Sequence, residues 1–318
     1  MKKTLLNRER INGRVYDHNL ALKVTGETSK NPGTEYIGGT LDVVTDEAGL
    51  NVVTVHFTYV TAVTSKGNNN ATFTALKNII DSNKTVLNCG MNDALMVRID
   101  TALALNDFYT NRTGEEVLVS AKRNEGGFVT IVNKLDEEGT RNNFEFDMLI
   151  NGTRIVEADP ERHIDEDYLI VKGAVFNFRN AILPVEFIVK DKGGMKYFES
   201  LDAAPNNMIF TKVWGKIQSQ TIVDKREEES SFGEPSIKEY TRTVREWVIT
   251  GAAKEPYDMS DEENGISAEE IKTAIADREV YLADIKKRQD EYQASKNAAT
   301  PVLAGNAAIT AQMGGFNF

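Results

Sequence analysis

Apolar and polar residues alternate along much of the chain, and residues 51–60 show the pattern most clearly. Val53, Val55, Phe57 and Tyr59 occupy every second position there, with Thr or His between them. A period of two is typical of a strand with one buried face and one exposed face. The first half of the chain is therefore expected to consist mainly of strands.

The segments around this strand predict an order of elements. Asp-Glu-Ala-Gly at 46–49 predicts a turn that joins the strand to an earlier one as a hairpin. Apolar residues at helical spacing predict a short amphipathic helix over residues 72–82. Two more strands are predicted at 95–105 and 116–135. Three strands, a helix and two strands are the order of the five-stranded oligonucleotide/oligosaccharide-binding (OB) barrel.

The second half of the chain repeats much of this order. Ile-Asn-Gly at 11–13 recurs at 150–152. The segments that follow also correspond: 36–41 with 169–174, 52–60 with 184–190, 96–99 with 210–215, and 117–132 with 240–250. A second barrel is therefore expected. It is expected to lack a clear helix, since only residues 197–204 could form a short turn, and to have a long charged loop at 224–239.

The last sixth of the chain has a different composition. Ser267-Ala-Glu-Glu270 is a capping box, and Ile266 and Ile271 are placed as its hydrophobic staple, which predicts the start of a helix. The predicted class is mostly β with an α appendage: two OB-like five-stranded barrels in tandem, a C-terminal helix and a flexible tail. The expected parts are an N-terminal arm (1–10), a first OB-like domain (11–140), a second OB-like domain (141–257), an acidic linker (258–266), the helix (267–296) and the tail (297–318).

Composition narrows the class of protein. The 318 residues suffice for two domains, and a hydrophobic content of 41% is ordinary for a soluble protein. The single Cys89 excludes an internal disulfide framework and fits a reducing compartment. Residues 1–10 lack the apolar stretch of a signal peptide, and no run approaches a membrane-spanning length. We expect a cytoplasmic protein, located in the host cytoplasm if it is phage-encoded, with no membrane partner.

The sequence shows little sign of catalytic chemistry. His18, His56 and His163 are scattered without metal-ligand spacing, and Cys89 lacks the context of a nucleophile. Phosphate-cradling glycine motifs are absent from the sequence, and consecutive carboxylates on loops usually only face water. The expectation is a non-enzymatic protein with no catalytic residue, no metal and no cofactor.

The charge pattern favours a binding role. The formal net charge is −11, but acidic residues concentrate at 227–229 and 258–263, while the β-segments carry Lys and Arg among aromatic residues. Aromatic rings that stack on bases and cations that neutralise phosphates hold single-stranded nucleic acid. The candidate residues are Phe57, Tyr59, Arg98, Phe108, Tyr109, Arg112, Lys122, Arg123, Phe128, Phe176, Phe178, Arg179, Lys212, Trp214 and Lys216. Any one of these rings could equally belong to a barrel core. Trp214 alternates with Lys212 and Lys216, so the three are expected to share a face.

Several of these segments carry a resemblance to a known class of protein. The Ile-Asn-Gly openings, Val97-Arg98-Ile99 followed by residues 106–109, and the in-strand Gly173 and Gly215 resemble single-stranded-DNA-binding proteins built from OB folds. In particular, the chain resembles the tandem-OB type found in bacteriophage replication modules, over about residues 11–257. Many such proteins end in an acidic tail with a terminal Phe that recruits replication enzymes. Phe316 and Phe318 match the terminal Phe, and the resemblance implies replication proteins as their partners, but the last residues contain no acid.

Three functional hypotheses follow. The first is sequence-independent binding of single-stranded DNA in phage DNA replication or recombination, through aromatic stacking and phosphate contacts, with self-association through the 267–296 helix. The alternative is a phage structural or assembly protein that uses its β-domains for protein–protein contacts. An enzyme is the third, and it would need carboxylates or metal ligands brought together from distant segments.

Overall fold

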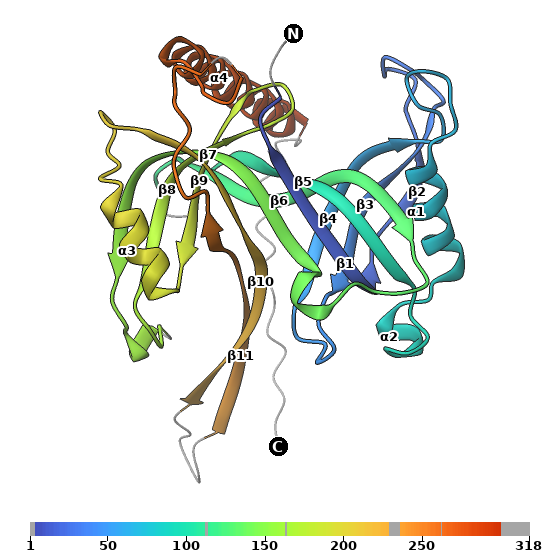
Figure 1. The fold of residues 1–318 in the computed structure, drawn as a ribbon. Helices are drawn as coiled ribbons and strands as arrows, with labels where there is room; N and C mark the ends of the chain where they lie inside the picture. The colour runs from blue at the N-terminus through green and yellow to red at the C-terminus, as the bar shows by residue number, and fades with distance from the viewer. Residues whose placement is uncertain (1–3, 112–113, 163, 229–235, 262, 300–318) are drawn as a thin grey trace, which may run out of the picture.

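The computed structural model describes residues 4–111, 114–162, 164–228, 236–261 and 263–299 (Figure 1). The strands are β1 (Asn7–His18), β2 (Ala21–Val24), β3 (Glu35–Val44), β4 (Val52–Thr61), β5 (Met96–Thr110), β6 (Val117–Ile131), β7 (Asn142–Val156), β8 (Tyr168–Phe176), β9 (Ile182–Val189), β10 (Ile209–Glu228) and β11 (Ser236–Ala252). The helices are α1 (Ala71–Ser82), α2 (Val86–Cys89), α3 (Lys192–Ser200) and α4 (Ala268–Ala299), with single 3-10 turns at Glu138–Thr140 and Pro160–Arg162. The predicted class, mostly β with a C-terminal helix, is confirmed.

Strand pairing arranges the chain in two circuits of the same design. In the first, β1 pairs with β3, β3 with β4, β4 with β6, β6 with β5, and β5 with β1. The second runs β7–β8–β9–β11–β10 and returns to β7. In each circuit one pairing is parallel, β4 with β6 and β9 with β11, and a helix precedes the fourth strand. This is an OB-like strand order.

The two circuits are joined into one structure. The first half of β1 also pairs with β7, so that all eleven strands form a single sheet. One hydrophobic cluster runs through both circuits and includes Ile11 and Leu76 from the first and Phe144, Phe146 and Phe187 from the second. The three phenylalanine rings stack with centroids 4.7–5.6 Å apart. The halves therefore share a core.

The helix of the second circuit was not expected from the sequence. Two glycines, Gly193 and Gly194, lie in the first turn of α3 and lower its intrinsic helix propensity. The side chain of Asp191 caps the helix by accepting a hydrogen bond from the Gly194 N–H at 2.7 Å, and Phe198 anchors it in the core. Tertiary burial thus overrides the local preference, and the expectation of no clear helix is wrong.

Other boundaries also differ from the expected ones. β1 begins at Asn7, within the expected N-terminal arm, and Leu5 is already buried. The expected loop at 224–239 is mostly strand, because β10 continues to Glu228 and β11 resumes at Ser236. These strands form a long ribbon that projects from the body of the molecule (Figure 1).

The C-terminal region packs its helix against the second circuit. A second, smaller hydrophobic cluster lies under α4. In it Ile266 and Ile271 pack with Leu149, Phe176 and Phe210 of the strands. The expected tail, from residue 300 onward and including Phe316 and Phe318, lies outside the described residues. Among the described residues, no helix is long and apolar enough to cross a membrane.

Candidate nucleic-acid interface

Five neighbouring strands, β10, β7, β1, β5 and β6, present one continuous side to solvent, which we call the outer face. Their other side is the shared core. Strand register aligns Lys216 with Asn143, Asn143 with Arg10, Arg10 with Asp100, and Asp100 with Phe128. Directly paired residues project from the same side of a sheet. This row therefore crosses both circuits without a break.

Adjacent rows add further basic and aromatic residues. Trp214 is paired with Glu145, and Glu145 with Arg8. Arg98 belongs to the row on the other side of Arg10, where it pairs with Asn12 and Thr130. Lys212 precedes Trp214 by two residues, at the neighbouring outward position of β10, opposite Asp147. These four rows define the outer face from here on, and their charged residues and exposed rings are Arg8, Arg10, Arg98, Asp100, Phe128, Glu145, Asp147, Lys212, Trp214 and Lys216.

The two rings of the outer face are exposed for local backbone reasons. Phe128 is 75% exposed and follows a β-bulge at Gly126 and Gly127. Both glycines have positive φ, 64° and 103°, and a Cβ on Gly127 would overlap the Asp100 carbonyl oxygen at 1.7 Å. The bulge therefore requires glycine, and it turns Phe128 outward.

Trp214, 38% exposed, lies against the strand next to it. A Cβ built on Gly251 would meet the indole Nε1 at 2.4 Å, so the absence of a side chain at Gly251 lets the ring lie flat there. Four strand spacings of about 4.8 Å separate β10 from β6, which puts the two rings roughly 20 Å apart across the outer face.

The cations of the outer face are partly paired with its carboxylates. Arg8 Nη2 and Arg10 Nε lie 3.1 and 3.0 Å from the same Asp100 Oδ1. Burial opposes ionisation of Asp100, but the hydrogen bonds from Arg8 and Arg10 outweigh it and hold the pKa of this carboxyl below its ordinary value. Lys212 Nζ lies 3.2 Å from Glu145 Oε2.

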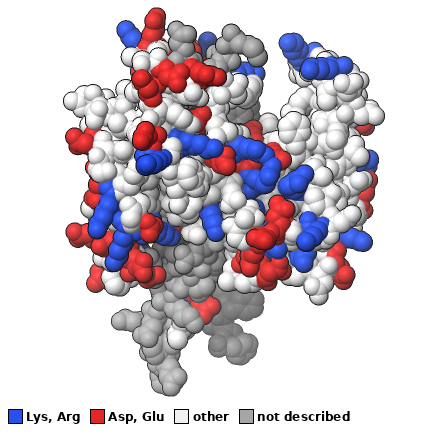
Figure 2. Space-filling model, in the orientation of Figure 1, with Lys and Arg blue, Asp and Glu red and all other residues white. Residues whose placement is uncertain are grey.

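The outer face is basic within an acidic chain. It carries five cations (Arg8, Arg10, Arg98, Lys212, Lys216) and three carboxylates (Asp100, Glu145, Asp147), an excess of two positive charges, whereas the whole chain has a net charge of −11. Figure 2 shows Lys and Arg side chains following one another across the middle of this side of the molecule, with acidic side chains between them. A local basic surface can hold a polyanion despite the acidic total.

With this geometry in place, comparison with known proteins adds a family. A family model named YorF matches residues 6–288, which is most of the chain. The chain belongs to the YorF family. The match covers both circuits and most of α4, so the whole arrangement of strands around the outer face falls within the YorF region. The family name alone assigns no activity.

Two further comparisons add little to the YorF assignment. Among curated proteins, none matches the sequence. A solved structure of a deletion mutant of the single-stranded DNA binding protein from Thermus aquaticus matches with 12% sequence identity and a TM-score of 0.43, and the match covers 82% of this chain and 99% of that chain. A likeness of this size does not establish a shared fold or function. The interface of this YorF-family chain is argued from its own residues.

Five of the residues expected from the sequence lie together on the outer face of this YorF chain: Arg98, Phe128, Lys212, Trp214 and Lys216. Trp214 shares its face with both lysines, as the alternation in β10 predicts.

Four expected residues are packed elsewhere. Phe57 is 2% exposed in the shared core and Phe176 is fully buried beneath α4, so neither can stack on a base. The backbone of Tyr109 is bonded to Gln289 of α4. Lys122 is half-buried between the circuits. Its ammonium donates to the Glu186 carbonyl at 2.6 Å and lies over the rings of Phe187 and Trp247.

The remaining expected residues are dispersed. Tyr59 packs on Tyr36 of β3, with ring centroids 4.7 Å apart. Arg123 is paired with Glu125, and Phe108 is exposed on the β5–β6 hairpin. Phe178 and Arg179 lie at the β8–β9 turn, with the guanidinium 5.1 Å from the ring centroid. Arg112 lies outside the described residues.

Sequence reasoning missed Arg8 and Arg10. The segment was assigned to an N-terminal arm because the first recognised motif, Ile-Asn-Gly, begins at Ile11, directly after Arg10. A weak signal was present, since Arg8 and Arg10 alternate with Glu9 and Ile11, both of which are fully buried. Only the double pairing of β1, with β5 and with β7, shows that both arginines lie in the middle of the outer face.

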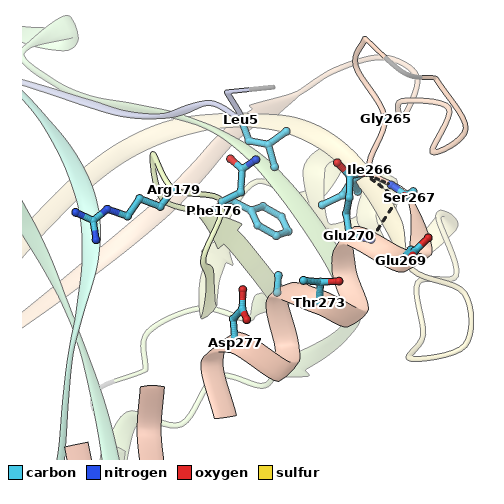
Figure 3. Close-up of a pocket in the computed structure, with 12 residues that line it drawn as sticks. Leu5, Phe176, Arg179, Gly265, Ile266, Ser267, Glu269, Glu270, Thr273 and Asp277 are labelled. Carbon is cyan, nitrogen blue, oxygen red and sulfur yellow. Dashed lines mark hydrogen bonds between the residues drawn. The ribbon is translucent and has the colours of Figure 1, made fainter. Parts of the chain in front are cut away.

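A hollow at the start of α4 is the alternative candidate site (Figure 3). Its volume is about 240 Å³, and Leu5, Phe176 and Ile266 form its apolar floor. Glu270, one of its carboxylates, accepts from the Ser267 N–H at 2.9 Å, while Ser267 Oγ accepts from the Glu270 N–H at 3.2 Å. This carboxylate therefore caps the helix. Over the part of the chain that the structure describes, no three His, Cys, Asp or Glu side chains gather as a metal site.

Proposed function

We propose that this protein binds single-stranded DNA on its outer face, without sequence preference and without catalysis. The observation that carries the proposal is that two exposed rings and five cations share one uninterrupted sheet face across both circuits. Each stacked base contributes about 1–3 kcal/mol and does so for any base, because every base has a π-face.

The arrangement favours single strands over duplex. Phe128 and Trp214 can stack only on bases that are unpaired and turned toward the protein, and a duplex keeps its base faces inside. The cations between the rings would meet the phosphates that link the stacked bases. The outer face offers no side-chain pattern for reading one base sequence, so we infer a general role in phage DNA replication or recombination.

The direct test is a fluorescence titration with oligo-dT at two salt concentrations. Trp247 is buried and donates its indole N–H to Glu9 at 2.9 Å, so quenching by DNA is expected to come from Trp214. Phe128→Ala should weaken binding by about 5- to 150-fold, the equivalent of one stacked base. The matched control is Phe178→Ala, which removes an equally exposed ring at the β8–β9 turn, outside the five strands of the outer face.

The cations are tested by the slope of affinity against salt. For single strands, log K falls against log salt with a slope of about −0.7 per phosphate contact, so the triple variant Arg98→Ala, Lys212→Ala, Lys216→Ala should flatten the slope by roughly 2. Absence of binding at low salt would overturn the proposal and favour a structural or assembly protein that uses these strands for protein contacts.

A further inference from the structure

The cations of the outer face are not all free to meet a ligand. Arg8 and Arg10 both bond Asp100, and Lys212 bonds Glu145. In contrast, Arg98 and Lys216 make no ion pair with any described residue. Three of the five cations are thus already occupied by carboxylates of the same face.

Asp100 lies on the path that a bound strand would take. It is the residue between Arg10 and Phe128 in the central row, and its side chain is 31% exposed. A base stacked on Phe128 would place its phosphates beside this carboxylate. Glu145 occupies the equivalent place beside Trp214, to which it is directly paired, and it is 50% exposed.

These ion pairs are weak enough to be exchanged. Pairs between partly exposed side chains stabilise a protein by only about 0–1 kcal/mol. A phosphate offers the same guanidinium a charge-assisted, bidentate hydrogen bond, so it can replace a carboxylate without loss of bonding. The freed carboxylate would then lie near the phosphates and repel them.

We infer that Asp100 and Glu145 are built-in competitors of the DNA phosphates on the outer face. In the free protein they hold Arg8, Arg10 and Lys212 flat on the sheet, and on binding they release these cations to the DNA backbone. The inference rests on the proposed function. It assigns to the two carboxylates the role of limiting affinity at this site.

The inference predicts tighter binding when either carboxylate loses its charge. Asp100→Asn keeps the size of the side chain and should lower the Kd for oligo-dT by roughly 3- to 10-fold at low salt, because one repulsive charge is removed and two arginines are released. The salt slope should stay close to the wild-type value, because the same cations meet phosphates in both complexes. Glu145→Gln should have the smaller effect, since it releases only Lys212.

The control must remove the same charge elsewhere. Asp81→Asn serves this purpose, because Asp81 is paired with Lys77 at 2.9 Å on α1, away from the outer face. It changes the net charge by the same amount and also releases one cation. Its Kd and salt slope should stay at the wild-type values.

The outcomes distinguish failure of the competitor role from failure of the proposed DNA binding. If wild-type protein binds and Asp100→Asn binds equally or more weakly, the carboxylates position the arginines and the competitor role is wrong, while the proposed function stands. If neither protein binds at low salt, the proposed function itself fails. Melting temperatures of both variants check folding, and Glu145→Gln provides an independent test if Asp100→Asn is unstable.

Discussion

At the scale of single residues, Glu9 is the least expected feature of the molecule. It lies on the buried side of β1, where that strand pairs with β5 and β7 at once. Glu9 Oε1 accepts from the Trp247 indole at 2.9 Å, and Oε2 has no hydrogen-bond partner among the described residues. Burial raises the pKa of this carboxyl to about 8, against the lowering effect of the Trp247 hydrogen bond. Glu9 is therefore protonated at neutral pH.

This raised pKa predicts a loss of stability with rising pH. Between about pH 4.5 and 8 the folded protein keeps a proton that the unfolded chain releases, so the contribution of Glu9 to the free energy of unfolding falls across that window. Glu9→Gln cannot ionise. It should be more stable than wild type at pH 8, by on the order of 2–4 kcal/mol, and the difference should vanish near pH 4.5.

Urea unfolding at a series of pH values measures this difference. Glu291→Gln, an exposed carboxylate on α4, is the control and should show no such pH dependence. A difference between wild type and Glu9→Gln that stays constant with pH would show that Glu9 is charged in the folded state.

The sequence predicts which side of a strand a residue lies on better than it predicts how exposed the side chain is. Alternation puts Trp214 with Lys212 and Lys216, and the structure does the same. Alternation also puts Phe57 on the same side as Val53 and Val55, and all three side chains are buried in the core. Phe128 is exposed because of the bulge that precedes it, and the effect of a bulge on a side chain cannot be obtained from a period of two.

At the scale of elements, α4 is attached to the β5–β6 hairpin by polar side chains. Arg278 donates to both oxygens of Asp107, at 3.3 and 2.8 Å, and these side chains are only 11% and 2% exposed. Gln289 accepts from the Tyr109 N–H at 3.0 Å and donates to the Tyr109 carbonyl at 2.7 Å. The helix thereby satisfies backbone groups of β5 as a neighbouring strand would.

Substitution of Arg278 should break the ion pair that holds α4 to the β5–β6 hairpin. Arg278→Met leaves the Asp107 carboxylate buried without a counter-ion, which should lower the free energy of unfolding by about 3–5 kcal/mol. Arg288→Met is the matched control on the same helix. Its ion pair with Asp284 is exposed, so the expected loss is below about 1 kcal/mol.

Urea denaturation of the two variants gives the comparison. The double variant Arg278→Met, Asp107→Leu should recover much of the stability, because both charges are then replaced by apolar groups. Equal losses in Arg278→Met and Arg288→Met would mean that the buried pair does not hold the helix.

Local signals predict elements well where one interaction dominates. The capping box at Ser267 locates the start of α4, which begins at Ala268. The β10–β11 ribbon was mistaken for a loop because its charged residues give no apolar alternation. A two-stranded ribbon needs no buried face to satisfy its backbone, since the ladder continues from Val213↔Ala252 to Glu228↔Ser236.

At the scale of the whole molecule, the repeat predicted two similar halves but not their fusion. β1 belongs to both circuits. It pairs with β3 and β5 of the first circuit and with β7 of the second. Contacts of this kind involve residues far apart in sequence, such as Glu9 and Trp247, and leave no periodic signal. The division into domains at 11–140 and 141–257 therefore stays a prediction about sequence similarity.

The shared core predicts that the two halves unfold together. Lys122 of the first half covers Phe187 and Trp247 of the second, and Glu9 bonds Trp247, so loss of one half exposes the apolar interior of the other. Both tryptophans, Trp214 and Trp247, report on the second half. A fluorophore on the exposed Cys89, the only cysteine, reports on the first.

The two probes should give the same midpoint in urea, as a cooperative two-state transition requires. Under the same conditions the isolated fragment 141–257 should lack fixed tertiary structure, because β7 has lost its β1 neighbour and the core residues have lost their cover. Separate midpoints, or a fragment with native near-ultraviolet circular dichroism, would show two independent domains. The outer face would then be a surface assembled from two folding units, with the β1–β7 ladder as the joint between them.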